Sequence, residues 1–172
     1  MSAALGPLER VDGSWVVGEI RGPAGRWVEF RPDGLHQHAP DSEAELIPWS
    51  RIMLGIRLTV GQKYPDRPMA SINVFAGLPG PWRRRSGGCL HMTLRHPYED
   101  WTARFDRHDR WYNLTEVTLL GELLSQTVAA GEAHLLGDAD RLSRVVTRLA
   151  LQRPRTNGAF HRAVTEAREA AG

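Results

Sequence analysis

Apolar residues alternate with polar ones through most of the first 113 residues, and they recur at helical spacing from Leu114 onward. A period of two is typical of a strand with one buried face, whereas recurrence at three and four residues is typical of an amphipathic helix. The sequence therefore predicts a β-rich part followed by a helical part. Because the alternation is one-sided, it favours antiparallel sheet with one face in solvent.

The clearest predicted strand spans residues 52–60, where every second residue is apolar. Residues 90–94 and 101–105 repeat this alternation, and residues 96–100 between them form a short polar, proline-containing connection typical of a hairpin turn. The pattern predicts one shared core. Its expected members are Leu54, Ile56, Leu58, Leu94 and Phe105, with Arg57, Thr93 and Arg104 outside.

Further short strands are predicted on both sides of this segment, at residues 15–20, 27–31, 35–39, 44–47 and 69–75. A turn is predicted at residues 31–34. Pro32 has a fixed φ angle that suits a turn, and Gly34 can adopt a backbone conformation that most residues avoid. The expected fold class is α+β. We expect one antiparallel sheet of about seven to eight strands, curled into a barrel or a split sandwich and followed by two or three C-terminal helices.

The helical part is divided by residues that begin and end helices. Asn113 with Glu116 has the form of a capping box, and Gly131 suits a helix end. Asp138 or Asp140 is expected to cap a second helix that ends by Pro154, and a third helix is expected to begin at Asn157 or Gly158. The expected apolar stripes are Leu114, Val117, Leu120, Leu124 and Val128; then Leu142, Val145, Val146 and Leu149; then Phe160, Ala163, Val164 and Ala167.

The order of elements over residues 27–60 carries a family resemblance. A strand, a Pro-Asp-Gly turn and a second strand precede Glu45-Leu-Ile-Pro-Trp-Ser-Arg-Ile52, which leads into the long apolar strand. This order resembles bacterial members of the pleckstrin-homology-like (PH-like) superfamily. The resemblance implies a PH-like β-barrel with its capping helix over residues 14–130, and additional helices over residues 131–172 packed on it or extending from it.

The resemblance also bears on function. In lipid-binding members of the superfamily, basic residues gather on the loop between the first two strands. Here that loop is either residues 21–26, with arginines only at its two ends, or the acidic Pro-Asp-Gly turn. The resemblance therefore implies a binding or docking module rather than a particular lipid ligand, since such folds host many functions.

Composition and charge narrow the class of protein. The 172 residues are 41% hydrophobic and 24% charged, which excludes a disordered chain, a collagen-like chain and a coiled-coil rod. A net charge of +2 is small for a nucleic-acid-binding protein, which usually carries a concentrated basic surface. Cys89 is the only cysteine, so no intrachain disulfide forms. With no signal-peptide pattern, and with Glu122 and Gln126 interrupting the longest apolar stretch, we expect a soluble cytoplasmic protein without a transmembrane segment.

Three groups of residues could carry chemistry. His36 and His38 share a strand face, as two metal ligands would, with Asp41 nearby; the alternative is a solvated strand face. His108 beside Asp106 and Asp109 could support acid–base work, and Cys89 with His91 could form a thiol nucleophile; the alternative is solvated charge at strand ends. No phosphate-loop, dinucleotide, GxSxG, CxxC or HExxH motif occurs. No catalytic residue, cofactor or metal site is predicted.

The most unusual stretch is the aperiodic segment at residues 76–88. It contains Trp82 followed by Arg83, Arg84 and Arg85, a combination that suits contact with an acidic protein surface, a nucleic-acid backbone or an anionic membrane. These four residues are the predicted partner-binding site. The alternative is a solvated connecting loop. Five other tryptophans are expected to pack the barrel or its helix: Trp15, Trp27, Trp49, Trp101 and Trp111.

The sequence therefore favours a non-enzymatic binding or docking module for a protein partner in the cytoplasm. The partner would use an exposed strand edge or the groove beside the first helix. One alternative is a small enzyme with a His/Asp pocket in the barrel mouth. The other is binding to an anionic membrane surface or nucleic acid through the Trp-Arg segment. The oligomeric state stays open.

Overall fold

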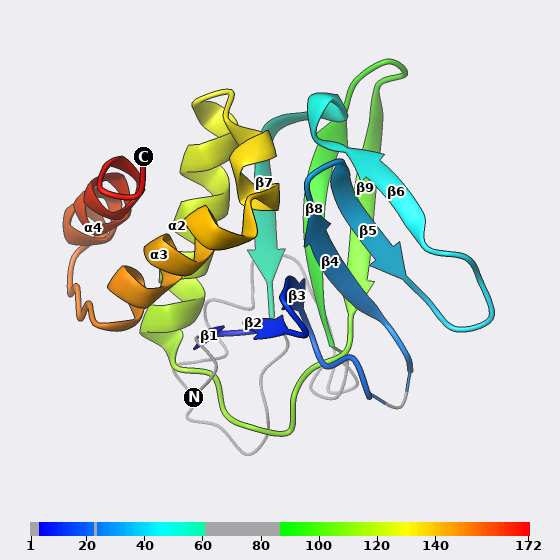
Figure 1. Cartoon of the computed structure of the whole chain (residues 1–172), viewed down its shortest axis with the longest axis horizontal. Helices are drawn as coiled ribbons and strands as arrows, with labels where there is room; N and C mark the ends of the chain where they lie inside the picture. Colours follow the sequence, from blue (N-terminus) through cyan, green and yellow to red (C-terminus); the bar gives the residue numbers. More distant parts are fainter. Residues whose placement is uncertain (1–3, 23, 61–86) are drawn as a thin grey trace, which may run out of the picture.

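The computed structural model describes residues 4–22, 24–60 and 87–172. These residues form two antiparallel sheets and a layer of helices beside them (Figure 1). The strands are β1 (Ala4–Leu5), β2 (Leu8–Val11), β3 (Ser14–Val17), β4 (Trp27–Arg31), β5 (Gly34–His38), β6 (Glu45–Pro48), β7 (Ile52–Thr59), β8 (Gly88–Leu94) and β9 (Glu99–Phe105). The helices are η1 (Trp49–Arg51), α2 (Leu114–Ala129), η3 (Ala133–Gly137), α3 (Ala139–Ala150) and α4 (Asn157–Glu169).

The α+β class, the antiparallel pairing and the three C-terminal α-helices are confirmed. The strands do not form one curled sheet, however. Strands β1 to β6 pair in sequence order in one sheet, and β7, β8 and β9 form another. The one-turn helix η1 lies between β6 and β7, and it interrupts the strand ladder at that point. The described residues therefore form no closed barrel. The strand expected at residues 69–75 lies outside the described residues.

Strand β7 departs from simple alternation at its centre. Met53 pairs with Thr93 and Ile56 pairs with Met92, so Leu54 and Gly55 form a bulge without partners on β8. Both bulge residues have positive φ, 65° for Leu54 and 127° for Gly55. Leu54 is consequently 80% exposed, and its expected place in the core is wrong. Because the bulge contains an even number of residues, Ile52 and Ile56 still face the core.

The alternations predicted for residues 90–94 and 101–105 are confirmed, although Trp101 is only partly buried, as is Leu58 on β7, which was also expected in the core. Leu90, Met92 and Leu94 are buried along β8, and Ala103 and Phe105 are buried along β9, as expected for one inward face. The turn at residues 31–34 joins β4 to β5, with Arg31 paired to Gly34. A Cβ atom at position 34 would collide with the backbone carbonyl of Ile47 on β6, so only glycine fits that turn.

Helix α2 begins at the expected cap, Asn113, but Glu116 in its first turn does not make the expected capping-box contact. Asn113 Oδ1 accepts a hydrogen bond from the Thr115 N–H at 2.9 Å. Glu116 does not close a capping box; its carboxylate accepts from the Gly6 N–H at 3.3 Å and so holds the β1–β2 turn against the helix. Leu114, expected in the apolar stripe, is 68% exposed. Further along the helix, Leu119, Leu120, Leu123, Leu124 and Val128 are buried.

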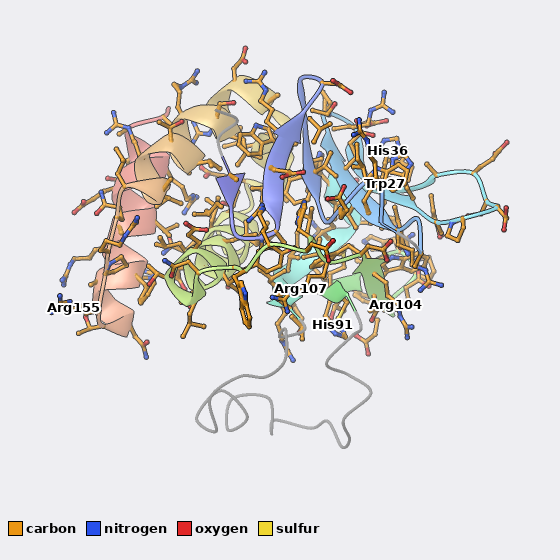
Figure 2. The ribbon with its side chains drawn as sticks, turned by 90° about the horizontal axis from the view of Figure 1, so that it is seen from below. Trp27, His36, His91, Arg104, Arg107 and Arg155 are labelled. Atoms are coloured by element: carbon orange, nitrogen blue, oxygen red, sulfur yellow. The ribbon has the colours of Figure 1, made fainter. Side chains whose placement is uncertain are left out.

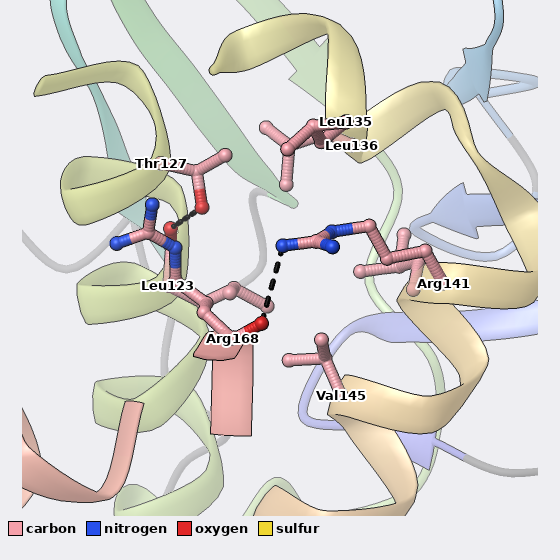
Figure 3. A pocket seen from close by; sticks show the side chains of 8 residues that line it. Leu123, Thr127, Leu135, Leu136, Arg141, Val145 and Arg168 are labelled. Atoms are coloured by element: carbon pink, nitrogen blue, oxygen red, sulfur yellow. Dashed lines mark hydrogen bonds between the residues drawn. The ribbon is translucent and has the colours of Figure 1, made fainter. Parts of the chain in front are cut away.

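Helix α4 lies on the side of α2 away from β7, and α3 crosses α2 in Figure 1 and contacts both helices. Asp138 caps α3 by accepting from the backbone N–H groups of Asp140 and Arg141, and Thr156 caps α4. The apolar stripe expected for α3 is buried in full. A cavity of about 10 Å³ remains between the helices, where Arg141 donates to the backbone carbonyl of Arg168 (Figure 3). This side of α2 is therefore filled by the chain's own helices.

No helix within the described residues has the length and apolar character needed to cross a bilayer.

Candidate functional site

The predicted partner-binding residues Trp82, Arg83, Arg84 and Arg85 lie outside the described residues. Binding of an anionic partner through them stays a prediction. The remaining candidates from the sequence lie on β5, on β8, and on the connection between β9 and α2.

His36 and His38 lie on β5, and each has its own acidic partner. His36 Nε2 is 2.9 Å from Asp33 Oδ1, and this hydrogen bond lowers the pKa of the Asp33 carboxyl. His38 Nε2 is 3.2 Å from Glu29 Oε2, and its ring stacks on Trp27 with centroids 4.4 Å apart. Among the described residues, no cluster of three or more His, Cys, Asp or Glu side chains could hold a metal ion. The two histidines belong to separate side-chain pairs.

Cys89 and His91 lie on the outward face of β8, where the Cys89 Sγ atom is 3.0 Å from His91 Nε2. His91 Nδ1 is in turn 3.1 Å from the Thr102 hydroxyl on β9. His91 and Arg104 project from this face in Figure 2. Burial raises the pKa of the Cys89 thiol. A hydrogen bond with Thr59 and the positive charge of Arg104 both lower it, but their effects are smaller than that of burial. The thiol is therefore protonated at neutral pH, the opposite of an activated nucleophile.

Asp106 directly follows β9 and is almost fully buried. Its Oδ2 atom accepts hydrogen bonds from the backbone N–H groups of Ala24 and Arg26, at 3.0 and 3.3 Å. Its own backbone N–H donates to the Arg26 carbonyl at 2.7 Å. These bonds tie the end of β9 to the connection between β3 and β4. The carboxylate thus has a structural role and does not face His108 as an acid–base partner.

His108 lies in the connection between β9 and α2, where it contacts both Tyr112 and Glu9, and it is only 5% exposed. The Tyr112 hydroxyl oxygen accepts from the His108 backbone N–H at 2.9 Å and lies 2.6 Å from His108 Nδ1. A hydroxyl carries one hydrogen and two lone pairs, so the same oxygen can accept the backbone bond and donate its hydrogen to Nδ1. Nε2 is 3.1 Å from Glu9 Oε1 on β2, but this buried nitrogen forms no hydrogen bond with any residue that the structure describes.

Two arginines complete the network around Tyr112. Arg110 donates to the Gly6 carbonyl at 2.9 Å and lies 3.5 Å from Glu9 Oε2. The guanidinium groups of Arg107 and Arg110 each lie 5.1 Å from the centre of the Tyr112 ring, within cation–π range. Burial raises the pKa of the Tyr112 hydroxyl, although the His108 backbone and the two arginines oppose that shift. The hydroxyl therefore stays protonated and available as a donor.

Two large apolar side chains project from this network into solvent. Trp111 is 58% exposed and Leu114, at the start of α2, is 68% exposed. We call Trp111 and Leu114 the exposed pair. Trp111 was expected to pack the barrel or its helix; that expectation is wrong, because the residue lies in the connection after β9 rather than on a strand. The sequence signal for this difference is that Trp111 follows the polar, aperiodic run from Asp106 to Arg110.

Comparison with known proteins gives no assignment, because no family model, curated protein or solved structure matches this chain. The chemistry of the site is therefore inferred from its own geometry. The His108 side chain is buried, its Nδ1 is 2.6 Å from the Tyr112 hydroxyl, and its Nε2 lies near Glu9 without a hydrogen bond. The arrangement fixes the backbone that presents Trp111 and Leu114.

Proposed function

We propose that this protein is a non-enzymatic docking module that binds a protein partner in the cytoplasm through Trp111 and Leu114. The observation that carries the proposal is a large exposed aromatic side chain on a backbone held by the contact between the buried His108 and the half-buried Tyr112. An exposed tryptophan costs solvation energy unless a partner covers it, and here the supporting network keeps it at the surface.

The composition of the site supports a protein partner. Tryptophan, tyrosine and arginine are the residues most often found at the energetic centres of protein interfaces. A rigid anchor loses little conformational entropy on binding, which leaves more of its contact energy as affinity. Trp111 has few rotatable bonds, and the network of His108, Tyr112 and Arg110 restrains the backbone on either side of it. The fitting partner presents an apolar pocket that accepts the exposed pair.

We also propose a PH-like architecture for the module. Strands β3 to β6 are four successive antiparallel strands, β7 to β9 are three more, and α2 follows them directly. This order supports the family resemblance inferred from residues 27–60. The hairpin β1–β2 and the helices α3 and α4 would then be additions to the shared architecture.

The alternative of a small enzyme has weaker support. Its candidate base, His108, is buried, with Nδ1 held by the Tyr112 hydroxyl, and one of the two nearby carboxylates, Asp106, accepts from backbone N–H groups. The thiol of Cys89, with its raised pKa, lacks the activation that a nucleophile requires. Trp111, by contrast, is 58% exposed, with the Arg107 guanidinium 6.0 Å from the centre of its ring.

The proposal is tested by affinity capture from a lysate of the source organism, with quantitative mass spectrometry of the bound proteins. The test variants are Trp111→Ala and Leu114→Ala. Tyr98→Ala is the matched control, because Tyr98 is also aromatic and 72% exposed but lies on the β8–β9 turn. We expect one or a few proteins to be captured by the wild type and by Tyr98→Ala, and to be depleted with both test variants.

A folding control accompanies the capture. Since Trp111 and Leu114 are mostly exposed, both variants should keep the thermal unfolding midpoint of the wild type. If the captured proteins are the same for wild type and Trp111→Ala, the exposed pair is not the docking site. If Tyr98→Ala loses the same proteins, binding does not discriminate between exposed aromatic residues, and the proposal fails.

A further inference from the structure

An acidic loop joins β5 to β6. All residues from Pro40 to Leu46 are exposed, and they include Asp41, Glu43 and Glu45 but no basic residue. These three carboxylates form no hydrogen bond or ion pair with any residue that the structure describes. Leu46, which follows them, is 43% exposed. We call residues 40–46, which are the end of the β5–β6 connection and the first two residues of β6, the acidic loop.

A basic face lies on the far side of the helical layer, where α3 passes into α4. The segment from Leu142 to Ala163 contains five arginines and no acidic residue. Arg148, Arg155 and Arg162 are exposed and make no hydrogen bond or ion pair within the described parts of the chain. An open pocket of about 220 Å³ is lined by Arg153 and Arg162, with Glu166 the one acidic residue in its lining. We call this surface the basic face.

An exposed leucine accompanies the unpaired arginines. Leu151, at the end of α3, is 79% exposed and lies three residues after Arg148. Residues three apart lie on the same side of a helical turn, so the two side chains are neighbours. The basic face therefore offers positive charge beside an apolar anchor. This combination fits an acidic protein segment that also carries an apolar side chain, and a nucleic-acid backbone would leave the leucine unused.

The acidic loop of this same chain has that composition. The two surfaces lie at opposite ends of the long axis of the molecule: α4 is at one end in Figure 1 and the β5–β6 connection at the other. Figure 2, seen from below, also places Arg155 at the end far from that connection. The acidic loop and the basic face of a single copy therefore cannot meet.

We propose that the acidic loop of one copy docks onto the basic face of a second copy. Asp41, Glu43 and Glu45 then pair with the unpaired arginines, and Leu46 packs near Leu151. Such a contact is heterologous, because it joins two different surfaces, and it leaves a free acidic loop and a free basic face at the ends of every assembly. The expected product is an open chain of copies that grows with concentration and does not stop at a dimer.

The expected strength is low and depends on salt. Exposed ion pairs contribute little individually, and they are screened once the Debye length falls below the separation of the charges. Association should therefore be visible at about 0.1 M salt, where the Debye length is about 10 Å, and weaken strongly at about 1 M, where it is about 3 Å.

Sedimentation velocity over a concentration series tests the proposal. One variant reverses the basic face (Arg148→Glu, Arg155→Glu, Arg162→Glu), and a second reverses the acidic loop (Asp41→Arg, Glu43→Arg, Glu45→Arg). The control reverses three exposed arginines elsewhere: Arg21→Glu, Arg57→Glu and Arg104→Glu. We expect the wild type and the control to associate with rising concentration. Each of the two test variants alone should remain monomeric, and an equimolar mixture of the two should associate again.

The mixture is decisive because the proposal predicts that opposite charge reversals restore complementarity. A wild-type chain that stays monomeric at every concentration in low salt overturns the proposal. So does a control that loses association as completely as the test variants, because the effect would then be one of net charge.

Tight binding of a single-stranded DNA 20-mer by the monomeric wild type, lost on reversal of the basic face, would assign that face to nucleic acid instead. Trp111→Ala should associate as the wild type does, so this result is independent of the docking proposal.

Discussion

The hydroxyl of Tyr112 holds both the backbone and the ring of His108, with its oxygen 2.9 Å from the backbone nitrogen and 2.6 Å from Nδ1. The two residues are four apart in the connection between β9 and α2, and Trp111 lies between them. One phenolic group therefore sets the local backbone conformation that places Trp111 in solvent. The stability of this pair can be measured without knowing the partner.

Replacing Tyr112 by Phe removes the hydroxyl and leaves the buried His108 Nδ1 and backbone N–H without their partner. Leaving a buried polar group unsatisfied costs about 1–3 kcal/mol. We expect the free energy of unfolding of Tyr112→Phe, measured by urea denaturation, to fall by about this amount. Tyr98→Phe, on the exposed β8–β9 turn, should change it by less than about 0.5 kcal/mol. Equal values for the two variants would mean that the pair does not hold the connection.

The raised pKa of Tyr112 gives a second prediction, for alkaline pH. Burial favours the neutral phenol in the folded state, so the folded protein keeps this proton at a pH where the unfolded chain has lost it. Stability from this group is present below the ordinary value of 10.0 and is lost as the pH rises toward the higher folded pKa. Absorbance of tyrosinate should show a late-titrating component that Tyr112→Phe removes and Tyr98→Phe leaves. A titration without that component would contradict the burial of the hydroxyl.

Alternation predicted most of the sheet core because packing on one face of a strand is a local property of the sequence. Ile56, Leu90, Leu94 and Phe105 all lie where the period of two places them. Leu54 fails because a bulge depends on backbone conformation rather than on hydrophobicity. Leu54 is apolar and fits the alternation of the strand. Only the neighbouring Gly55 indicates that a bulge could form here.

The candidate site was predictable only in part. His108 and Asp106 were singled out from their types, but their partners come from distant segments: Glu9 on β2 for His108, and the Ala24 and Arg26 N–H groups for Asp106. Such contacts depend on how β2 and the β3–β4 connection lie against the end of β9, which no local pattern encodes. The exposure of Trp111 was missed for the same reason, since an aromatic residue beside a strand is more often packed than presented.

The β7 bulge predicts a large difference between two neighbouring apolar residues. Ile56 is 1% exposed and Leu54 is 80% exposed. Truncating a buried isoleucine costs about 2–5 kcal/mol, because apolar contacts are lost and a cavity is left. Ile56→Ala should lower the free energy of unfolding by that amount, and Leu54→Ala should change it by less than about 0.5 kcal/mol. Similar losses for the two variants in chemical denaturation would contradict the bulge.

The raised pKa of Cys89 gives a prediction that bears on the enzyme alternative. Since the folded state favours the thiol over the thiolate, alkylation by iodoacetamide should be slow at neutral pH, and its rate should still be rising with pH beyond the ordinary value of 9.0. His91→Ala should not reduce the rate at neutral pH if the imidazole does not activate the sulfur. Fast alkylation at pH 7 that depends on His91 would instead support a thiol nucleophile on β8.

The central claim is that Trp111 and Leu114 anchor a protein partner, and the dissociation constant of the captured partner tests it most directly. Interface anchors typically contribute about 2 kcal/mol or more when truncated to alanine, which corresponds to at least about a 25-fold loss of affinity. Isothermal titration calorimetry with the purified partner should show a loss of this size for Trp111→Ala and a smaller one for Leu114→Ala. Tyr98→Ala should bind as the wild type does. An unchanged dissociation constant for Trp111→Ala would contradict the claim.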